Sequence, residues 1–237
     1  MCYNRTKAKK EYLMKTHQQP IATVDAVLLT LHEEKIKAVL IRRPEAPYAG
    51  HHALPGGYVH TQEDTNDQDA IKRVVRTKLG IQKLFLEQLF TVANQSRDPR
   101  GWSLSVVFLG IFSPSSMPDL PEYAEIYDVE KLPQDIAFDH EEILQGAVAR
   151  LKGKGAYSTL PAKFLDSPFT LTQLQNVYEI VLGKPLETSA FRRKIKALDL
   201  LEKTEQMTSG QGRPSQMWTL KETMQTFDKR SLLPAGF

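Results

Sequence analysis

Residues 168–237 carry the pattern that most constrains what this chain can fold into. Helix-like apolar spacing predicts a first helix that ends at Gly183 and a second helix over residues 189–198, with Thr188 as its N-cap. Only the short segment GKPLE separates the two helices. Because two short helices joined by a tight turn are typical of a helix-turn-helix, we expect one in this part of the chain.

The second predicted helix has two chemically different faces. Phe191, Ile195 and Leu198 are spaced i, i+4 and i+7, which places them on one buried face. The opposite face carries polar and basic side chains, namely Ser189, Arg192, Arg193 and Lys196. Such side chains bind phosphates and base edges when a recognition helix enters the major groove of DNA. The alternative is a small protein-interaction domain with a solvated basic face.

A β-hairpin is predicted to follow the second helix. Its strands are residues 201–207 and 216–220, and its tip contains Gly210 and Gly212, which permit a tight turn. Arg213 lies at this tip, where the wing of a winged helix can reach the minor groove or a phosphate. The predicted DNA-binding residues are Thr188, Ser189, Arg192, Arg193, Lys196, Ser209, Gly212 and Arg213.

The distribution of charge is compatible with binding of a polyanion by residues 168–237. Residues 1–167 contain 21 basic and 21 acidic residues, whereas residues 168–237 contain 10 basic and 7 acidic residues, so the whole excess of +3 lies in the second segment. A basic bias is the electrostatic footprint of nucleic-acid binding, although a random scatter of solvated charge gives the same count.

Residues 21–152 alternate between strand and helix patterns. Apolar runs predict strands at residues 23–31, 36–41, 84–94 and 103–112, and a strand and turn at 125–133. Helices are predicted at residues 70–79 and 141–151. This order suits a mixed sheet with helices on its faces, which places the chain in the α/β or α+β class.

Four segments are therefore expected: an N-terminal arm (1–20), a sheet domain (21–152), a linker (153–167) and the helix-turn-helix domain (168–237). The linker is placed where Gly, Pro and Ser are mixed. The apolar stretches are too short to span a bilayer, and no charged-then-apolar leader opens the sequence. Together with a single cysteine, Cys2, this predicts a cytoplasmic protein without an internal disulfide.

Residues 54–81 resemble the Nudix box, the metal-binding segment of Nudix hydrolases. The family pattern has a glycine, a glutamate six positions later, and a helix in which an arginine precedes three glutamates and a glycine. Gly57, Glu63 and Arg73 occupy the positions of the first glycine, the first glutamate and the arginine. The three helical glutamates are replaced by Val74, Thr77 and Lys78. The segment is also two residues longer than the family pattern, an insertion that we place in its acidic loop.

The missing glutamates predict that hydrolysis by the Nudix route is lost. The resemblance implies divalent cations on one helical face, and such hard cations need several oxygen ligands. Here one position is apolar, one is a neutral hydroxyl, and Lys78 is a cation that repels a metal. Asp64, Asp67 and Asp69, placed in the loop before the helix, are the alternative metal cluster. We expect no catalysis, no metal and no required cofactor.

Ligand binding can survive this loss. Gly56 and Gly57 permit backbone conformations that bring amide groups close to phosphates. Arg97 and Arg100 can bind diphosphate or ribose oxygens bidentately, although structural ion pairs are equally compatible with their sequence. A pocket-lining histidine and a stacking tyrosine complete the predicted effector site, which consists of Gly56, Gly57, Arg97, Arg100, His140 and Tyr48.

Both halves of the chain resemble the NrtR family of Nudix-related repressors of NAD-metabolism genes. The resemblance is strongest in AGHHALPGGYV, RDPRGW, AFDHEEIL and FTLTQLQNVYEIVLGKPL, and it covers nearly everything after about residue 20. It implies a Nudix α/β/α sandwich followed by a winged helix, a homodimer, a palindromic double-stranded DNA operator, and ADP-ribose or a related nucleotide that releases the DNA. Two rivals are an active Nudix pyrophosphatase with an atypical metal site and a sister regulator that senses a sugar metabolite.

Overall fold

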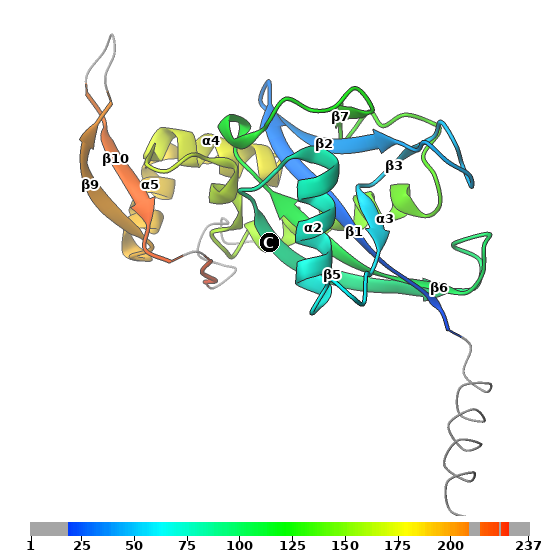
Figure 1. Cartoon of the computed structure of the whole chain (residues 1–237). Helices are drawn as coiled ribbons and strands as arrows, with labels where there is room; N and C mark the ends of the chain where they lie inside the picture. Colours follow the sequence, from blue (N-terminus) through cyan, green and yellow to red (C-terminus); the bar gives the residue numbers. More distant parts are fainter. Residues whose placement is uncertain (1–18, 209–213, 223, 228–237) are drawn as a thin grey trace, which may run out of the picture.

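The computed structural model describes residues 19–208, 214–222 and 224–227. Its larger part is a seven-stranded mixed sheet in which β1 pairs with β6 in parallel and with β2 in antiparallel orientation (Figure 1). The strands are β1 (Ile21–His32), β2 (Lys35–Arg42), β3 (His52–Ala53), β4 (Gly56–Tyr58), β5 (Phe85–Asn94), β6 (Ser103–Ile111) and β7 (Ala124–Asp128). The mixed sheet expected from the sequence is therefore confirmed.

The central strand β1 is buried on both faces from residue 24 to residue 30. It lies between β2 and β6 in the sheet, so its side chains pack on helices on either side. Glu33 and Glu34 connect β1 to β2, with φ angles of 52° and 59°. Two consecutive left-handed residues form the kind of tight turn that matches the twist of a hairpin.

Helix α2 (Asp67–Leu79) covers one face of the sheet and α3 (His140–Gly155) covers the other. The start of α2 was predicted three residues too late, because its N-cap is Asn66, whose side chain accepts a hydrogen bond from Asp69 N. Asp67 and Asp69 are therefore in the first helical turn, where carboxylates stabilise the helix dipole, and not in the preceding loop. The predicted end of α2 at Gly80 is confirmed.

The second unit is a winged helix built from two helices and a three-stranded sheet (Figure 1). Its elements are β8 (Phe169–Thr170), α4 (Leu171–Leu182), α5 (Thr188–Ala197), β9 (Leu201–Met207) and β10 (Gln216–Leu220). A capping box between Thr170 and Gln173 begins α4, and Gly183, with φ 67°, ends it. The predicted strands of the hairpin are confirmed at their predicted bounds.

Two details of the winged helix differ from or extend beyond the prediction. The N-cap of α5 is Glu187 and not Thr188, because the Glu187 carboxylate accepts hydrogen bonds from Ser189 N at 2.7 Å and Ala190 N at 2.5 Å. An acidic side chain at this place also stabilises the positive end of the helix dipole. The predicted wing-tip contacts Ser209, Gly212 and Arg213 lie outside the described residues, as does most of the predicted arm.

Residues 153–167 are a buried helical junction where a Gly- and Pro-containing linker was expected. Helix α3 continues to Gly155, and the 3-10 helix η2 (Leu160–Phe164) is mostly buried. Val177 and Val181 of α4 belong to the same hydrophobic cluster as the sheet and α3. A Cβ on Gly155 would lie 2.8 Å from Val181 Cγ1, so glycine here permits close packing of α3 on α4 and does not mark a linker.

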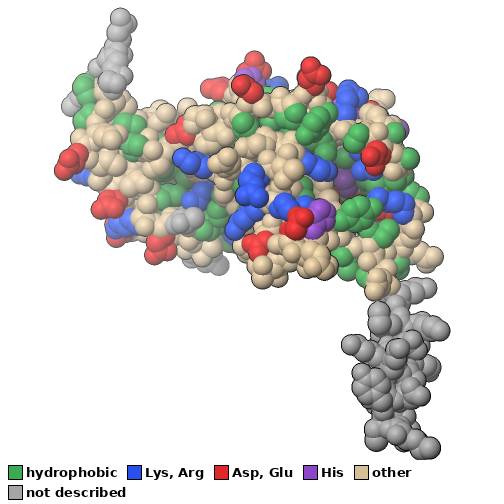
Figure 2. Space-filling model, in the orientation of Figure 1, with side chains coloured by type: hydrophobic (Ala, Val, Ile, Leu, Met, Phe, Trp, Pro, Cys, Tyr) green, Lys and Arg blue, Asp and Glu red, His purple; other side chains and the backbone are tan. Residues whose placement is uncertain are grey.

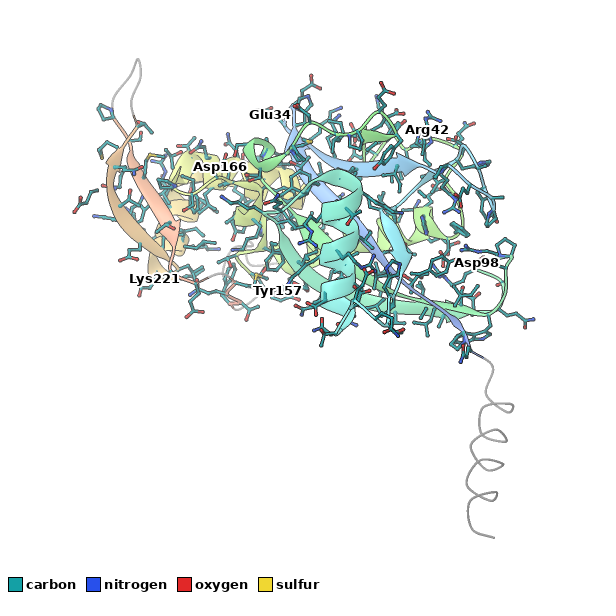
Figure 3. All side chains as sticks on the ribbon, viewed as in Figure 1. Glu34, Arg42, Asp98, Tyr157, Asp166 and Lys221 are labelled. Atoms are coloured by element: carbon teal, nitrogen blue, oxygen red, sulfur yellow. The ribbon has the colours of Figure 1, made fainter. Side chains whose placement is uncertain are left out.

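Polar contacts also connect the two units. Tyr178 Oη of α4 donates a hydrogen bond to the carbonyl oxygen of Ser158 at 2.8 Å. Ser113, which precedes the 3-10 helix η1 (Pro114–Ser116), donates to Asp166 Oδ1 at 2.5 Å. Asp166 and Tyr157 lie between the sheet domain and the winged helix (Figure 3). Within the described residues, none of the helices combines the length and apolar character that membrane crossing demands.

Candidate functional site

A cavity of about 270 Å³ opens at the end of the sheet that lies away from the wing. Strand β1, the loop after β2, β4, the end of α2, the β5–β6 loop and the start of α3 supply its walls. Asp98, which lines this cavity, and Lys221, beside the wing strand β10, lie at opposite ends of the molecule (Figure 3). A ligand in the cavity is therefore remote from the wing.

Five of the six predicted effector-site residues line the cavity, namely Gly56, Gly57, Arg97, Arg100 and His140. Tyr48 does not line it, because its ring packs edge-on against Phe138 at a centroid distance of 4.8 Å. The phenyl ring of Phe138 and the phenol ring of Tyr58 take the lining positions instead. The sequence pattern contained the aromatic residues but no signal for which of them faces the cavity.

The two predicted arginines are both held by carboxylates. Arg97 is nearly buried, and its Nε and Nη2 each donate to Asp139 at 2.9 Å. Arg100 donates to Asp98 through Nε at 2.9 Å and Nη2 at 2.6 Å, and through Nη1 to Tyr58 Oη. The alternative of structural ion pairs is therefore correct for both side chains, although both still line the cavity.

Two further cations line the cavity and were missed as binding residues by sequence reasoning. Arg43 donates through Nε to Pro47 O at 2.8 Å, and its guanidinium lies 4.7 Å from the Phe138 ring centroid. Lys78 Nζ donates to Gly56 O at 2.6 Å. In the described part of the chain, neither side chain forms an ion pair with a carboxylate within 4.0 Å.

Asp25 is a buried carboxylate in the wall of the cavity, on strand β1. It accepts a hydrogen bond from Ser105 Oγ at 2.5 Å and lies 3.8 Å from both Arg97 Nη2 and His140 Nε2. A Cβ on Gly56 would lie 1.8 Å from Asp25 Oδ1, so only glycine fits there. A single carboxylate between apolar neighbours, in the run Val24-Asp25-Ala26, was the sequence signal that could have identified Asp25.

His140 is a neutral, structural part of the same wall. Its Nδ1 accepts a hydrogen bond from Leu54 N at 2.9 Å, which requires that this nitrogen carries no proton. Burial lowers the pKa of His140, against the opposing effect of Asp25. His52 is buried in β3 and contacts Asp135 at 2.8 Å through Nδ1.

The residues present do not fit the divalent cations that the Nudix resemblance implies. Val74 is buried in the core, and Lys78 adds a positive charge where the family has a metal-binding glutamate. Arg73 donates to both oxygens of Asp64 at 2.7 Å and holds the pKa of this carboxyl at about 2. Among the described residues, no three His, Cys, Asp or Glu side chains are grouped to hold a metal, so the alternative acidic cluster does not form.

The basic face of α5 is exposed, while Phe191 and Ile195 are buried beneath it. The exposed side chains include all five predicted contacts on this helix, namely Thr188, Ser189, Arg192, Arg193 and Lys196. Gln175 Nε2 fixes the turn before α5 by donating to Leu186 O at 3.0 Å and Thr188 Oγ1 at 3.2 Å. Elsewhere on the visible face, positive and negative side chains are interspersed (Figure 2).

Fold and site together define a two-domain class of protein, in which a Nudix-like domain without metal-binding glutamates is joined to a winged helix. The family model of the NrtR DNA-binding winged helix domain matches residues 161–220. The chain is 35% identical over 212 residues to the ADPR responsive transcriptional repressor NtrR of Acinetobacter baylyi, covering 88% of this chain and 85% of that protein. The chain belongs to the NrtR family.

Two other relatives are informative. NrtR of Shewanella oneidensis complexed with a 27mer DNA superposes with a TM-score of 0.77 and 32% identity, covering 89% of this chain and 95% of that one. The Nudix domain of the same protein complexed with ADP ribose gives a TM-score of 0.53 and 31% identity, covering 60% and 98%. The ADP-ribose pyrophosphatase of Methanocaldococcus jannaschii is 33% identical over 57% of this chain and 76% of its own length.

Proposed function

We propose that this chain is a DNA-binding transcriptional repressor that ADP-ribose, or a related nucleotide, releases from its operator. The observation that carries this proposal is the exposed cationic face of α5 in a winged helix, combined with a cation-lined cavity in a Nudix-like domain. Among the described residues of this domain, no three potential metal ligands are grouped. The DNA complex and the ADP-ribose complex of the Shewanella relative support the two halves of the proposal.

DNA binding is assigned to α5, with Arg192, Arg193 and Lys196 as the principal contacts. Their neighbours Phe191 and Ile195 anchor the helix in the core, so the cationic side chains project from a fixed surface. Arginine can bind guanine edges bidentately, and all three side chains can neutralise phosphates. We place the DNA-binding domain at residues 168–237 and the effector-binding domain at residues 21–152.

The chain is proposed to act as a homodimer on a palindromic operator upstream of NAD-metabolism genes. A winged helix binds a short half-site, and a two-fold symmetric pair places two recognition helices about one helical turn apart on the same side of the duplex. A nucleotide can release such a dimer only if it binds better to a geometry in which this spacing is lost.

Nucleotide hydrolysis is not part of the proposed function. The similarity to a pyrophosphatase extends over 57% of the chain. In the Nudix-like part, Val74, Thr77 and Lys78 stand at the positions of the three helical glutamates. Three oxygen ligands for a hard cation are therefore missing from α2. An active pyrophosphatase is the second candidate, and formation of AMP from ADP-ribose in the presence of Mg²⁺ or Mn²⁺ would distinguish it from a repressor.

Arginine substitution tests the DNA-binding half. Duplexes selected by the full chain from a random pool should contain an inverted repeat, and fluorescence anisotropy then gives the affinity. We expect Arg192→Ala and Arg193→Ala each to abolish specific binding and to leave ADP-ribose binding intact. Arg76→Ala, at an exposed position on α2, is the matched control and should bind DNA normally. Loss of ADP-ribose binding in the α5 variants would contradict separable sites.

A further inference from the structure

The four cations around the cavity are not equivalent. Arg97 and Arg100 each form a bidentate ion pair, with Asp139 and Asp98 respectively. A guanidinium that is already neutralised in this way gains little from an added anion, because the anion must compete with the carboxylate. The two arginines therefore shape the wall of the cavity more than they supply free positive charge.

Arg43 and Lys78 differ from this pair in their partners. Arg43 donates to the backbone carbonyls of Pro47 at 2.8 Å and Glu45 at 3.4 Å, and Lys78 donates to the carbonyl of Gly56 at 2.6 Å. Carbonyl oxygens orient a cation without neutralising it. Among the described residues that line the cavity, these two cations thus keep a full positive charge directed at the same space.

Keeping two such charges in one partly buried wall is unfavourable, and the nearby carboxylates Asp25 and Asp98 offset this only in part. Burial lowers the pKa of Lys78, and Arg43 lowers it further, although Asp25 opposes the shift. Burial also lowers the pKa of Arg43, followed by the effect of Arg100. A bound dianion removes this repulsion, since an opposite charge nearby favours the charged form of each side chain.

We propose that Arg43 and Lys78 bind the diphosphate of the effector without a metal, so that the ammonium of Lys78 takes over the charge of the absent divalent cation. This inference rests on the proposed nucleotide-binding function and adds which side chains bind the diphosphate of the nucleotide. Lys78 stands at a metal-binding glutamate position of the Nudix pattern, and its ammonium is held at the carbonyl oxygen of Gly56 in the cavity wall. Two adjacent phosphates match two cations, whereas a nucleoside monophosphate engages them less completely.

Calorimetric titration of the full chain tests this assignment. Wild-type protein is titrated in EDTA with ADP-ribose, inorganic pyrophosphate and AMP, and then in Mg²⁺. We expect both diphosphates to bind in EDTA, AMP to bind more weakly, and Mg²⁺ not to be required. Arg43→Met and Lys78→Met should each weaken diphosphate binding by about 10- to 100-fold, the range for a charge-assisted hydrogen bond.

Two matched controls lie on α2 outside the cavity lining. Lys72→Met and Arg76→Met remove the same charges at exposed positions and should leave the affinities unchanged. Lys78→Arg keeps the charge and should bind diphosphate more tightly than Lys78→Met. Operator affinity and the melting temperature are measured for every variant. Values like those of the wild type show that a loss of diphosphate affinity does not result from unfolding.

The outcomes separate this inference from the proposed function. The assignment of Arg43 and Lys78 is overturned if diphosphate binding requires Mg²⁺ or is unchanged in Arg43→Met and Lys78→Met. It is also overturned if the folded wild-type chain binds neither ADP-ribose nor pyrophosphate. If pyrophosphate binds in EDTA through these residues but ADP-ribose does not, the anion site stands and the proposed effector is wrong. If ADP-ribose binds as expected but does not release DNA, the site stands and the regulatory proposal fails.

Discussion

Val181→Ala should destabilise the whole chain, although Val181 belongs to α4 of the winged helix. Its side chain is fully buried in the cluster that includes β1, β6 and α3, and it packs against Gly155. Removing two buried methyl groups costs roughly 1–3 kcal/mol, because the transfer free energy is lost and the cavity refills only in part. For a chain of this size, about 2 kcal/mol lowers the melting temperature by about 4–8 °C.

The two tryptophans allow each unit to be followed separately. Trp102 lies just before β6 of the sheet domain and Trp218 lies in β10 of the wing sheet. In Trp102→Phe and Trp218→Phe backgrounds, fluorescence melting curves should coincide, and Val181→Ala should shift both equally. Asn176→Ala, at an exposed position on the same helix, should shift neither by more than about 0.5 kcal/mol. Two separate unfolding transitions, with Val181→Ala shifting only the one followed by Trp218, would refute a hydrophobic core shared by the sheet domain and the winged helix.

Three further predictions concern the cavity and the helix turn. Gly56→Ala should abolish ADP-ribose binding in calorimetry while DNA binding persists, because the added Cβ overlaps Asp25; unchanged affinity would contradict the close approach. Stability should fall as pH decreases below about 6.5, since folding keeps His140 neutral with a lowered pKa, and His140→Asn should flatten this part of a urea-unfolding pH profile. Gln175→Ala should weaken DNA binding several-fold in anisotropy assays by loosening the turn before α5, while Asn176→Ala, at an exposed position on α4, should not.

The sequence predicted element boundaries best where an apolar periodicity is followed by a residue that ends the element, such as glycine. The predicted ends of α2 and α4 are confirmed, with Gly80 and Gly183 in left-handed conformations, and both strands of the wing hairpin lie at their predicted bounds. Helix starts were less accurate, because several residues near a helix start can cap it. Asn66 and Glu187 are the N-caps because their side chains accept hydrogen bonds from backbone N–H groups of the first turn. The apolar spacing used to predict the helices does not show which of several polar residues makes these bonds.

The candidate site was predictable in outline but not in its charge pairing. Arg97 and Arg100, predicted to bind the effector, line the cavity, yet their carboxylate partners decide how much charge they retain. Asp139 lies 42 residues from Arg97, a separation at which sequence alone gives no pairing. Arg43 was overlooked because two consecutive arginines at the end of a strand, Arg42 and Arg43, carry no signal that tells which of them faces a ligand.

Operator release under metal-free conditions tests the central claim most directly. The full chain bound to a fluorescent duplex carrying its selected site is titrated with ADP-ribose in EDTA, and parallel samples with Mg²⁺ or Mn²⁺ are analysed for AMP. We predict a fall in anisotropy in EDTA and no AMP with either metal. Rapid metal-dependent formation of AMP, by a chain that does not bind duplex DNA at low salt, would contradict the claim that this chain is a repressor without hydrolase activity.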